Sequence, residues 1–593
     1  MEDESLRLQW ALTLGWKPAL TEEVSEPFIQ AATYHIFAVD GLRMAILFGI
    51  FFSLFRAFGL PRPICGAGLI PLLWFYVGLT GWPASAIRAT VMLTVVILGW
   101  VIRRPTELLN SLLVAALIIL VWQPQQLFQA GFQLSFLVVL CIILILTPLR
   151  SLAERWFSPD PLVPAQLRRP WPAIVRVPTR YLAGLTLTSL AAWIGSLPLV
   201  AYYFHIVTPV STPANVVAVP LCGLVLCSNL ISLLLGAWFP GAAELFNHAG
   251  WQLMEWIRVT SVWFSHWPHA YFYVPAPSLV TSTLYYGVLV AVATGWLFQR
   301  NLRSWKLAGF ACLTCCWGWQ SWQGSSATRL SILASGGGTA IYFDAPGSRN
   351  DLLIDCGTTN SVRLVIKPFL RAQGLSRLPG LLLTHGDLHH VGGAQMIAGL
   401  FSANQVLASP VRFRSAAYRR TLAEFNQKPG LVRNISCGDQ TGPWRILYPQ
   451  LSDHYAQADD NALVLAGVIR GTRVLLLSDL GRAGQEALLE RTPDLRADIV
   501  VASLPSAGEA LSDALIGAIQ PRLIVIQDLE FPVSERAGSK LRERLAQCNV
   551  PVIYTRSAGA ATIEFRGKEW ELRTMSGTGI NSRNSKPQKP NFR

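Results

Sequence analysis

The sequence predicts a polytopic α-helical membrane domain followed by a soluble α/β domain. The chain of 593 residues is 52% hydrophobic and only 14% charged, which is too apolar for a wholly soluble protein. Long uncharged runs lie in the first half, whereas Asp, Glu, Arg and His gather after about residue 325. Beyond that point strand-like and helix-like segments alternate, as they do in layered α/β folds. The shift in composition therefore indicates a domain boundary.

The first 40 residues are predicted to be a polar, amphipathic segment. A cleavable signal peptide begins with a basic stretch and continues into a compact apolar core. This chain begins instead with Glu2, Asp3 and Glu4 and lacks such a core. We therefore expect internal spans to direct the chain to the membrane.

Residues 41–323 are predicted to form a multi-span membrane domain. A membrane-spanning helix needs roughly 20 apolar residues to cross ~30 Å of hydrocarbon. The windows that meet this length most clearly are 63–87, 130–149, 181–204, 207–239 and 275–298, and weaker windows are 44–60, 89–102, 108–122 and 307–322. Because the longest windows have room for two helices, we expect roughly eight to ten spans.

Four polar residues in apolar surroundings are candidates for a substrate path. A guanidinium beside an apolar span costs at least a few kcal/mol if it faces lipid, so Arg88 should face a polar interior or an interface. There it is a candidate phosphate contact, although an arginine that snorkels to the membrane surface is equally compatible with its position. Gln133, His205 and Asn215 either line the path or join helices through hydrogen bonds.

Residues 328–575 are predicted to form the soluble domain, after a Gly- and Ser-containing joint at 324–327. Short apolar runs predict strands at 329–333, 340–343, 351–354, 380–383, 462–465, 473–477, 499–502, 523–526, 551–554 and 561–565. Helices are predicted at 483–491 and 512–519. The basic tail at 576–593 has almost no apolar residues from which to build a core, so we expect it to be disordered.

A dense group of possible metal ligands follows the strand predicted at 380–383. The sequence THGDLHHVGG, residues 384–393, places His385, Asp387, His389 and His390 within six residues. Imidazole and carboxylate groups together suit zinc, manganese or iron. The density of the cluster indicates descent from a metal site, and it leaves open whether an ion is bound.

The motif and its surroundings resemble the metallo-β-lactamase fold, an αββα fold whose hydrolases carry H-x-H-x-D-H here. They also resemble the ComEC competence family, which typically shows T-H-x-D-x-D-H-x-G-G. The resemblance continues through LLIDCG at 352–357, DNALVL at 460–465 and LLLSDLG at 475–481. It implies that Asp479 occupies the place of the aspartate that bridges two metal ions in this fold.

The sequence departs from the family pattern at several positions. His389 stands where the family has an aspartate, and the opening D-V-G-Q-G-D turn reads ASGGGT, residues 334–339. Where the family has His-His-Gly-Ser, this chain has SLPSAG, with Leu504 and Pro505 in the histidine places. Neither residue can bind metal, so a two-metal hydrolase would be short of ligands at its second site.

Two interpretations of this domain remain open. His385, Asp387 and Asp479 are able to hold one zinc or manganese ion, and His390 and His389 could support a second ion weakly. A competent metal-dependent phosphodiester hydrolase would use Asp387 and Asp479 as catalytic residues. The missing ligands favour the alternative, a degenerate and mainly structural domain that holds one divalent ion or none.

The membrane part resembles the ComEC family independently. YHIFAVDGLRM at 34–44 is similar to the family's H-L-L-A-V-S-G-L-H entry, with Asp40 and Arg43 in place of the usual serine and histidine. Further similar segments follow in the same order, at 58–63, 74–89, 123–136 and 196–221. The N-terminal OB-like domain of longer family members is missing from this sequence.

The resemblance implies a DNA uptake channel that passes single-stranded DNA across the bacterial inner membrane during natural transformation. The implied partners are single-stranded DNA, the lipid bilayer and other competence proteins, namely a DNA receptor and a cytoplasmic translocase. Two alternatives stay open: a membrane-anchored metal-dependent nuclease, and a related transporter of another substrate, because no stripe of aromatic and basic residues specifies nucleic acid. The oligomeric state is not predicted.

Overall fold

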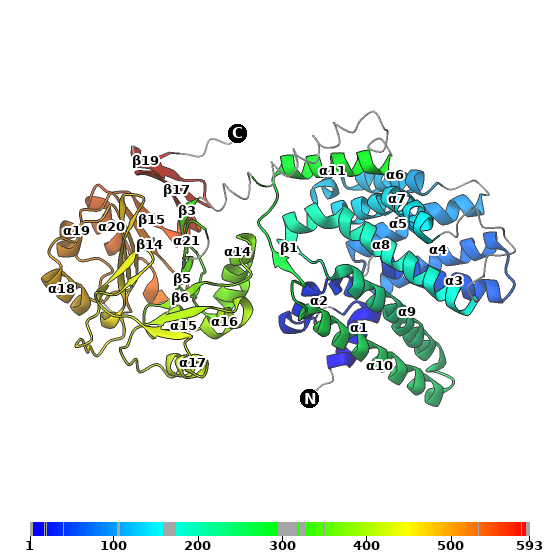
Figure 1. Cartoon of the computed structure of the whole chain (residues 1–593), viewed down its shortest axis with the longest axis horizontal. Helices are drawn as coiled ribbons and strands as arrows, with labels where there is room; N and C mark the ends of the chain where they lie inside the picture. The colour runs from blue at the N-terminus through cyan, green and yellow to red at the C-terminus, as the bar shows by residue number, and fades with distance from the viewer. Residues whose placement is uncertain are drawn as a thin grey trace. The chain divides into compact units, whose positions relative to one another are not determined.

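The protein divides into two compact units in a computed structural model, Met1–Leu313 and Thr314–Arg593 (Figure 1). The structure describes residues 4–588 apart from gaps at 17, 19, 39–40, 103–106, 158–172, 295–317, 319–326, 348–349, 507, 532 and 583. The window 307–322, apart from residue 318, and most of the predicted joint at 324–327 lie outside the described residues.

The first unit is helical. Its helices are α1 (Glu4–Leu14), α2 (Glu22–Gln30), α3 (Gly41–Ala57), α4 (Arg62–Leu79), α5 (Ala84–Val101), α6 (Leu108–Trp122), α7 (Ala130–Phe157), α8 (Ala173–Phe204), α9 (Ser211–Leu235), α10 (Pro240–Ser265) and α11 (Leu279–Ala293). Among the described residues, five helices are long and apolar enough to cross a membrane, namely α4, α5, α7, the part of α8 from Pro178, and α9. The apolar helices α6 and α11 are shorter.

The boundaries of two predicted windows differ from the observed helices. The window 63–87 is not one span, because α4 ends at Leu79 and α5 begins at Ala84. Gly81 and Trp82 reverse the chain between them with positive φ angles of 80° and 55°. The window 207–239 holds a single helix, α9, after the short strand β1 (Ile206–Val207). The expected eight to ten spans thus exceed the five long apolar helices of the described residues.

The polar N-terminal segment packs into the helical unit. Leu8 and Leu12 of α1 are fully buried in a cluster that includes residues of α9 and α10. Beside them, Gln9 Nε2 donates to Asn229 Oδ1 of α9 and, at 3.1 Å, to Asn247 Oδ1 of α10. Amide side chains in apolar surroundings join helices in this way because their polar groups need partners. The apolar and amide side chains of α1 therefore serve to pack this helix against α9 and α10.

The second unit contains two sheets. One has ten strands in the order β19-β18-β17-β16-β3-β4-β5-β6-β7-β8, and the other has seven in the order β15-β14-β13-β12-β11-β10-β9. The first eight strands of this unit are β3 (Thr328–Ile332), β4 (Ile341–Asp344), β5 (Leu352–Ile354), β6 (Gly380–Leu383), β7 (Gln405–Ala408), β8 (Val432–Asn434), β9 (Gln440–Thr441) and β10 (Trp444–Tyr448). The later strands are β11 (Val464–Ile469), β12 (Thr472–Ser478), β13 (Ile499–Ser503), β14 (Leu523–Gln527), β15 (Val552–Tyr554), β16 (Ala561–Arg566), β17 (Glu569–Thr574), β18 (Gly579–Asn581) and β19 (Asn584–Gln588).

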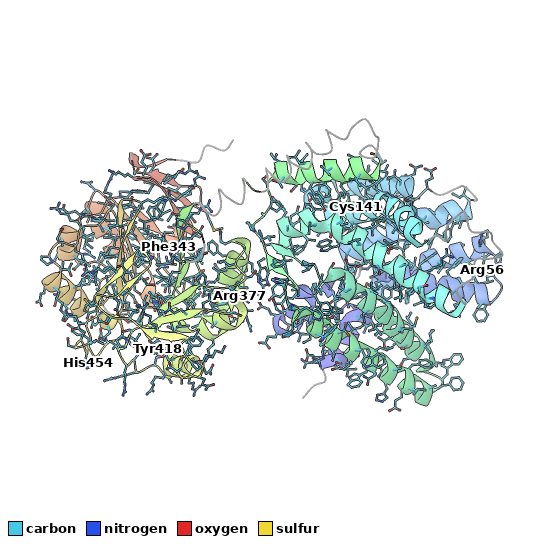
Figure 2. All side chains as sticks on the ribbon, viewed as in Figure 1. Arg56, Cys141, Phe343, Arg377, Tyr418 and His454 are labelled. Atoms are coloured by element: carbon cyan, nitrogen blue, oxygen red, sulfur yellow. The ribbon has the colours of Figure 1, made fainter. Side chains whose placement is uncertain are left out.

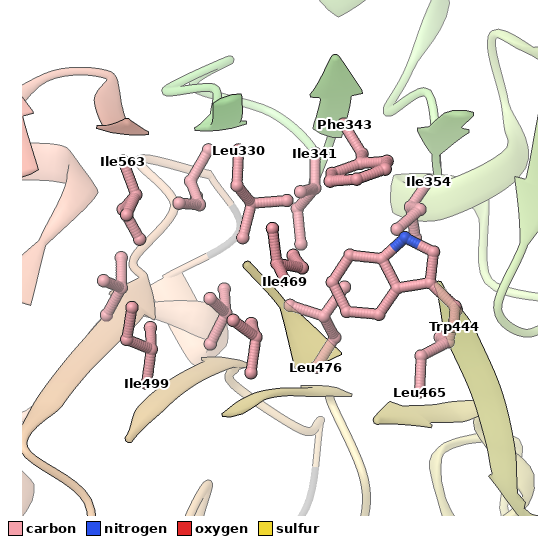
Figure 3. Packing of buried hydrophobic residues seen from close by; sticks show 14 of the residues in the cluster. Leu330, Ile341, Phe343, Ile354, Trp444, Leu465, Ile469, Leu476, Ile499 and Ile563 are labelled. Carbon is pink, nitrogen blue, oxygen red and sulfur yellow. The ribbon is translucent and has the colours of Figure 1, made fainter. Parts of the chain in front are cut away.

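The two sheets pack face to face around one hydrophobic core (Figure 3). Phe343 of β4 and Trp444 of β10 meet edge to face in this core, with ring centroids 5.4 Å apart. A second core lies between the seven-stranded sheet and helices that include α18 (Arg482–Arg491), α19 (Asp513–Ile519) and α20 (Ser539–Gln547). A third joins the ten-stranded sheet to α14 (Lys367–Ala372), α16 (Ala394–Phe401) and α17 (Ala416–Asn426), where Tyr418 is buried (Figure 2). The unit is therefore an αββα sandwich, which confirms the predicted fold class.

Each predicted strand of this unit overlaps an observed one, whereas the described part of the tail that was predicted to be disordered forms strands. The described part of the tail contributes β18 and β19, which extend the ten-stranded sheet beyond β17. Ile580 is buried there, and the remaining pairing is between backbone groups. Backbone hydrogen bonds to an open sheet edge do not require apolar side chains, so composition alone did not reveal these strands.

Candidate metal centre

Three buried side chains meet where two strands end. His385 follows β6, His390 lies on the short helix α15 (Leu388–Val391), and Asp479 follows β12. Their ligand atoms all lie within 4.8 Å of one another. The Nε2 atoms of His385 and His390 are each 3.2 Å from Asp479 Oδ2. Two imidazoles and one carboxylate thus converge on a single point inside the αββα unit.

Asp355 supports the cluster through Nδ1 of His390, the ring nitrogen that does not face Asp479. It follows β5 with a positive φ of 58°, and its Oδ2 lies 2.7 Å from His390 Nδ1. Its carboxylate also accepts hydrogen bonds from the backbone N and the hydroxyl of Thr384, at 2.9 and 2.7 Å. A carboxylate on the far nitrogen of an imidazole fixes the ring and its tautomer, which is the usual outer support of a metal-binding histidine.

The hydroxyl groups of Ser478 and Thr339 also contact the side chains of the cluster. Ser478 Oγ donates to Asp479 Oδ1 at 3.2 Å and lies 3.0 Å from Thr384 Oγ1. Thr339 Oγ1 lies 2.8 Å from His390 Nδ1, and its backbone N donates to His389 O at 3.0 Å. The ASGGGT turn, although it has no aspartate, therefore still holds the metal-motif segment in place.

The ionisable side chains of the cluster shift one another's pKa values. Burial lowers the pKa of His390, but the carboxylates of Asp479 and Asp355 outweigh it and raise that pKa well above its usual value. Burial raises the pKa of Asp479, and the neighbouring His385 and His390 outweigh this and hold it well below its usual value. The site therefore keeps an ionised carboxylate available to a cation.

The donor set fits a divalent metal ion. His385 Nε2 is buried and lies 3.2 Å from Asp479 Oδ2, but it forms no hydrogen bond of good geometry with any residue that the structure describes. A buried nitrogen without a hydrogen bond costs free energy that a metal–ligand bond would recover. Imidazole nitrogens with one carboxylate suit zinc or manganese, and either ion, when bound, would polarise a phosphate oxygen or activate a water.

Two residues of the predicted ligand set lie outside this close group. The side chain of Asp387 caps α15 by accepting a hydrogen bond from the backbone N of Leu388. His389 Nδ1 lies 3.0 Å from Gly337 O, and its ring is half-buried. Leu504 packs into the hydrophobic core beneath α18 and α19, as a non-ligand should. Sequence reasoning did not single out Asp355, although it belongs to the LLIDCG motif.

The candidate path residues lie in the helical unit. Arg88 of α5 is only 5% exposed, and its Nη2 donates to Ser135 Oγ of α7 at 3.3 Å. A Cβ added to Gly131 of α7 would lie 2.9 Å from the same Nη2, so the absence of a side chain lets α7 approach the guanidinium. Among the residues that the structure describes, Arg88 Nε has no hydrogen-bond partner, and no acidic residue forms an ion pair with this side chain.

The other three path candidates have different surroundings. Gln133 of α7 accepts a hydrogen bond from Tyr203 OH of α8 at 2.8 Å and donates to Leu127 O at 2.9 Å. It therefore joins helices. His205 Nδ1 and Asn215 Oδ1 are buried without a hydrogen-bond partner among the described residues, which leaves both free to meet a polar ligand. His205 also has a positive φ of 55°, at the break between α8 and β1.

The apolar helices and the αββα unit with its His/Asp cluster define a multi-pass membrane protein that carries a metallo-β-lactamase domain. The family model described as "Competence protein" matches residues 12–299, and that of the metallo-β-lactamase superfamily matches residues 336–444. The chain belongs to the competence protein family, the ComEC family.

Two relatives illustrate how far the similarity extends. The chain is 25% identical over 599 aligned residues to "ComE operon protein 3" of Bacillus subtilis (strain 168), an alignment that covers 95% of this chain and 72% of the relative. It is 23% identical over 382 residues to "Competence protein ComA" of Neisseria gonorrhoeae, which covers 62% of this chain and 50% of that relative. The similarity to the first relative thus includes both units.

Proposed function

We propose that this protein passes single-stranded DNA across the bacterial inner membrane during natural transformation. Membership in the competence family and the names of both relatives support a role in DNA uptake. The observation that carries the finer proposal is Arg88, a buried cation on a candidate span that lacks an acidic partner among the described residues. A DNA receptor and a cytoplasmic translocase are the expected partners.

The chemistry of Arg88 fits an anionic substrate. A charged group inside a membrane protein is costly unless it is paired, and such residues mark substrate pathways. Ser135 offers Arg88 only a neutral oxygen at 3.3 Å, and at Gly131 the guanidinium packs against the backbone of α7, which offers no charged partner. A guanidinium binds phosphate oxygens through several N–H groups at once. A phosphodiester backbone that passes along α5 and α7 would supply the missing anion.

Deletion of the gene is expected to abolish DNA uptake while leaving DNA bound at the cell surface. The measurement is transformation frequency together with retention of labelled DNA on intact cells. Unaltered transformation in the deletion strain would end the channel proposal. If transformation is unaltered but transport of another solute is lost, the related transporter becomes the function.

The metallo-β-lactamase domain is proposed to be partly degenerate and mainly structural. Leu504 lies in a hydrophobic core and offers no ligand, and Asp387 caps a helix. Asp479→Asn, which removes one charge but keeps the side-chain volume, is therefore expected to leave DNA uptake within about twofold of wild type. A loss as severe as deletion, with the variant still abundant in the membrane, would contradict this proposal.

The convergence of His385, His390 and Asp479 favours a second candidate function, a metal-dependent phosphodiester hydrolase. Residues His385, His390 and Asp479 would hold the ion, and the ion would supply the Lewis acid. Full-length protein in detergent should then cleave DNA with zinc or manganese, and Asp479→Asn should lose that cleavage. Stoichiometric metal without cleavage would support a structural ion instead.

A further inference from the structure

Four arginines lie close together on the surface of the αββα unit. Arg412 and Arg414 belong to the loop between β7 and α17, and Arg419 and Arg420 belong to the first two turns of α17. All four side chains are exposed. A helix rises about 1.5 Å per residue, so the last two arginines stand only about 6 to 8 Å along α17 from its N-cap, Ser415. These four arginines are the arginine group.

The loop that carries the first two arginines packs against the metal centre. Phe413, the residue between them, is buried, and its ring centroid lies 6.4 Å from that of His385. A Cβ added to Gly386 would collide with the Phe413 side chain, so the loop lies directly on the metal-motif segment. The helix α17 also contacts α15, which carries His390 (Figure 1). The arginine group is therefore held beside the metal centre.

The arginine group has no acidic partner among the described residues. Residues 409–428 contain five basic residues and a single acid, Glu424, and none of the four guanidinium groups forms an ion pair with a described carboxylate. Exposed arginines elsewhere in the αββα unit do pair with carboxylates. Such pairs are Arg482–Glu486, Arg496–Asp494, Arg522–Asp498, Arg566–Glu564 and Arg573–Glu571. The surface at the arginine group therefore carries concentrated positive charge, which attracts a polyanion.

The kind of positive charge points to phosphate. Four of the five basic residues of this segment are arginines, and a guanidinium donates paired N–H groups to phosphate oxygens. Arg412 and Arg414 precede the N-terminus of α17, where an 11-residue helix carries partial positive charge. The side chains and the helix thus add charge of the same sign at one place.

We propose that the arginine group binds the phosphate backbone of DNA beside the metal centre, without the help of a metal ion. This inference rests on the proposed role in DNA uptake, and it adds a DNA contact on the second unit to the contact proposed at Arg88 in the first. It also gives the αββα unit a role that does not need the ligands missing at Leu504 and Pro505. Electrostatic attachment to a phosphate backbone involves no bond cleavage.

The arginine group and the channel fail in different experiments. Binding is measured on purified protein, so a failed binding test leaves the prediction for the deletion strain untouched. Unaltered transformation in the deletion strain would end the channel proposal, and it would not change the affinity of the purified protein for DNA.

The test is equilibrium binding of labelled single-stranded and double-stranded oligonucleotides to full-length protein in detergent, followed by fluorescence anisotropy with a metal chelator present. The affinity of wild type is expected to fall as salt rises, because each phosphate contact releases counterions. Each contact contributes about 0.7 for single strands, or about 0.9 for duplex, to the magnitude of the slope of log affinity against log salt concentration. A variant that combines Arg412→Gln, Arg414→Gln, Arg419→Gln and Arg420→Gln should therefore have a slope shallower by about 2.8 or about 3.6. A change with only one form of DNA identifies the form that the surface binds.

A matched control removes the same total charge from the same unit. It combines Arg496→Gln, Arg522→Gln, Arg566→Gln and Arg573→Gln, four exposed arginines that pair with carboxylates. Its slope is expected to equal that of wild type. Replacement of the arginine group by four lysines keeps the charge, so it should retain most of the slope while affinity falls through loss of the paired N–H donors.

Several results would overturn the proposal. One is a glutamine variant that keeps the wild-type slope, and another is an equal loss of slope in the control, because the effect is then one of net charge. A third is binding by wild type that requires zinc. The last is displacement of the labelled DNA by phosphatidylglycerol micelles at a lower phosphate concentration than unlabelled DNA needs, which would assign the arginine group to an anionic lipid surface.

Discussion

Arg88→Ala is expected to lower transformation frequency by about tenfold to a hundredfold, with the protein still present in the membrane at its normal level. Removal of one charged hydrogen-bonding contact typically costs about 1.5–3 kcal/mol, and each 1.4 kcal/mol corresponds to a factor of ten. Arg88 has no acidic partner among the described residues, so alanine breaks no ion pair and should leave the fold intact. The measurement is transformation with homologous DNA, normalised to the amount of protein.

Three further variants give this prediction its controls. Arg88→Lys keeps the charge but loses the planar guanidinium with its paired N–H donors, so an intermediate loss of transformation is expected. Gly131→Ala places a Cβ against the guanidinium and should also impair uptake, without altering any charge. Arg62→Ala removes an exposed arginine at the start of α4 and should transform normally. Normal transformation by an abundant Arg88→Ala protein would show that Arg88 is not on the path.

The second large effect is expected from Asp355→Ala, which should destabilise the αββα unit by about 3–5 kcal/mol. The substitution leaves His390 Nδ1 without its carboxylate and Thr384 N without its acceptor, both inside the protein. It should also weaken metal binding, because the imidazole loses the group that orients it. Hydrogen–deuterium exchange of β5 and β6 in the full-length protein measures the change in local stability.

Asp387→Ala is the matched control for this variant. It removes a carboxylate from the same motif region, but one that is partly exposed and serves to cap a short helix. A helix cap typically contributes about 1 kcal/mol, so exchange in β5 and β6 should change little. Equal protection in the Asp355→Ala variant and in wild type would show that the support behind His390 is dispensable.

The sequence predicted the architecture well because periodicity and motif spacing are local. The strands β6, β13 and β14 fall almost exactly on apolar runs, and the THGDLHHVGG motif marks the strand end where the cluster forms. It predicted span boundaries less well, because an uninterrupted apolar window does not show where Gly81 and Trp82 turn the chain back. The sequence likewise did not predict β18 and β19, because these strands form by pairing with β17 at the edge of the ten-stranded sheet.

The contribution of Asp355 could not be predicted from spacing. Asp355 reaches His390 across 35 positions of sequence. It is positioned by pairing between strands, which brings distant strand ends to the same edge of a sheet. The lack of an acidic partner for Arg88 among the described residues could not be predicted either, because it is a property of the packed helices.

The pairing of β16 with β3 has a consequence for biosynthesis. Ser331 of β3 faces Thr562 of β16, 231 positions later in the chain. The first strand to leave the ribosome after the apolar helices must therefore wait, with one edge open, until nearly the whole unit has been translated. An unpaired edge of this kind invites aggregation. Premature stop codons before residue 561 should accordingly yield a protein whose second unit fails to mature, however well its helices insert.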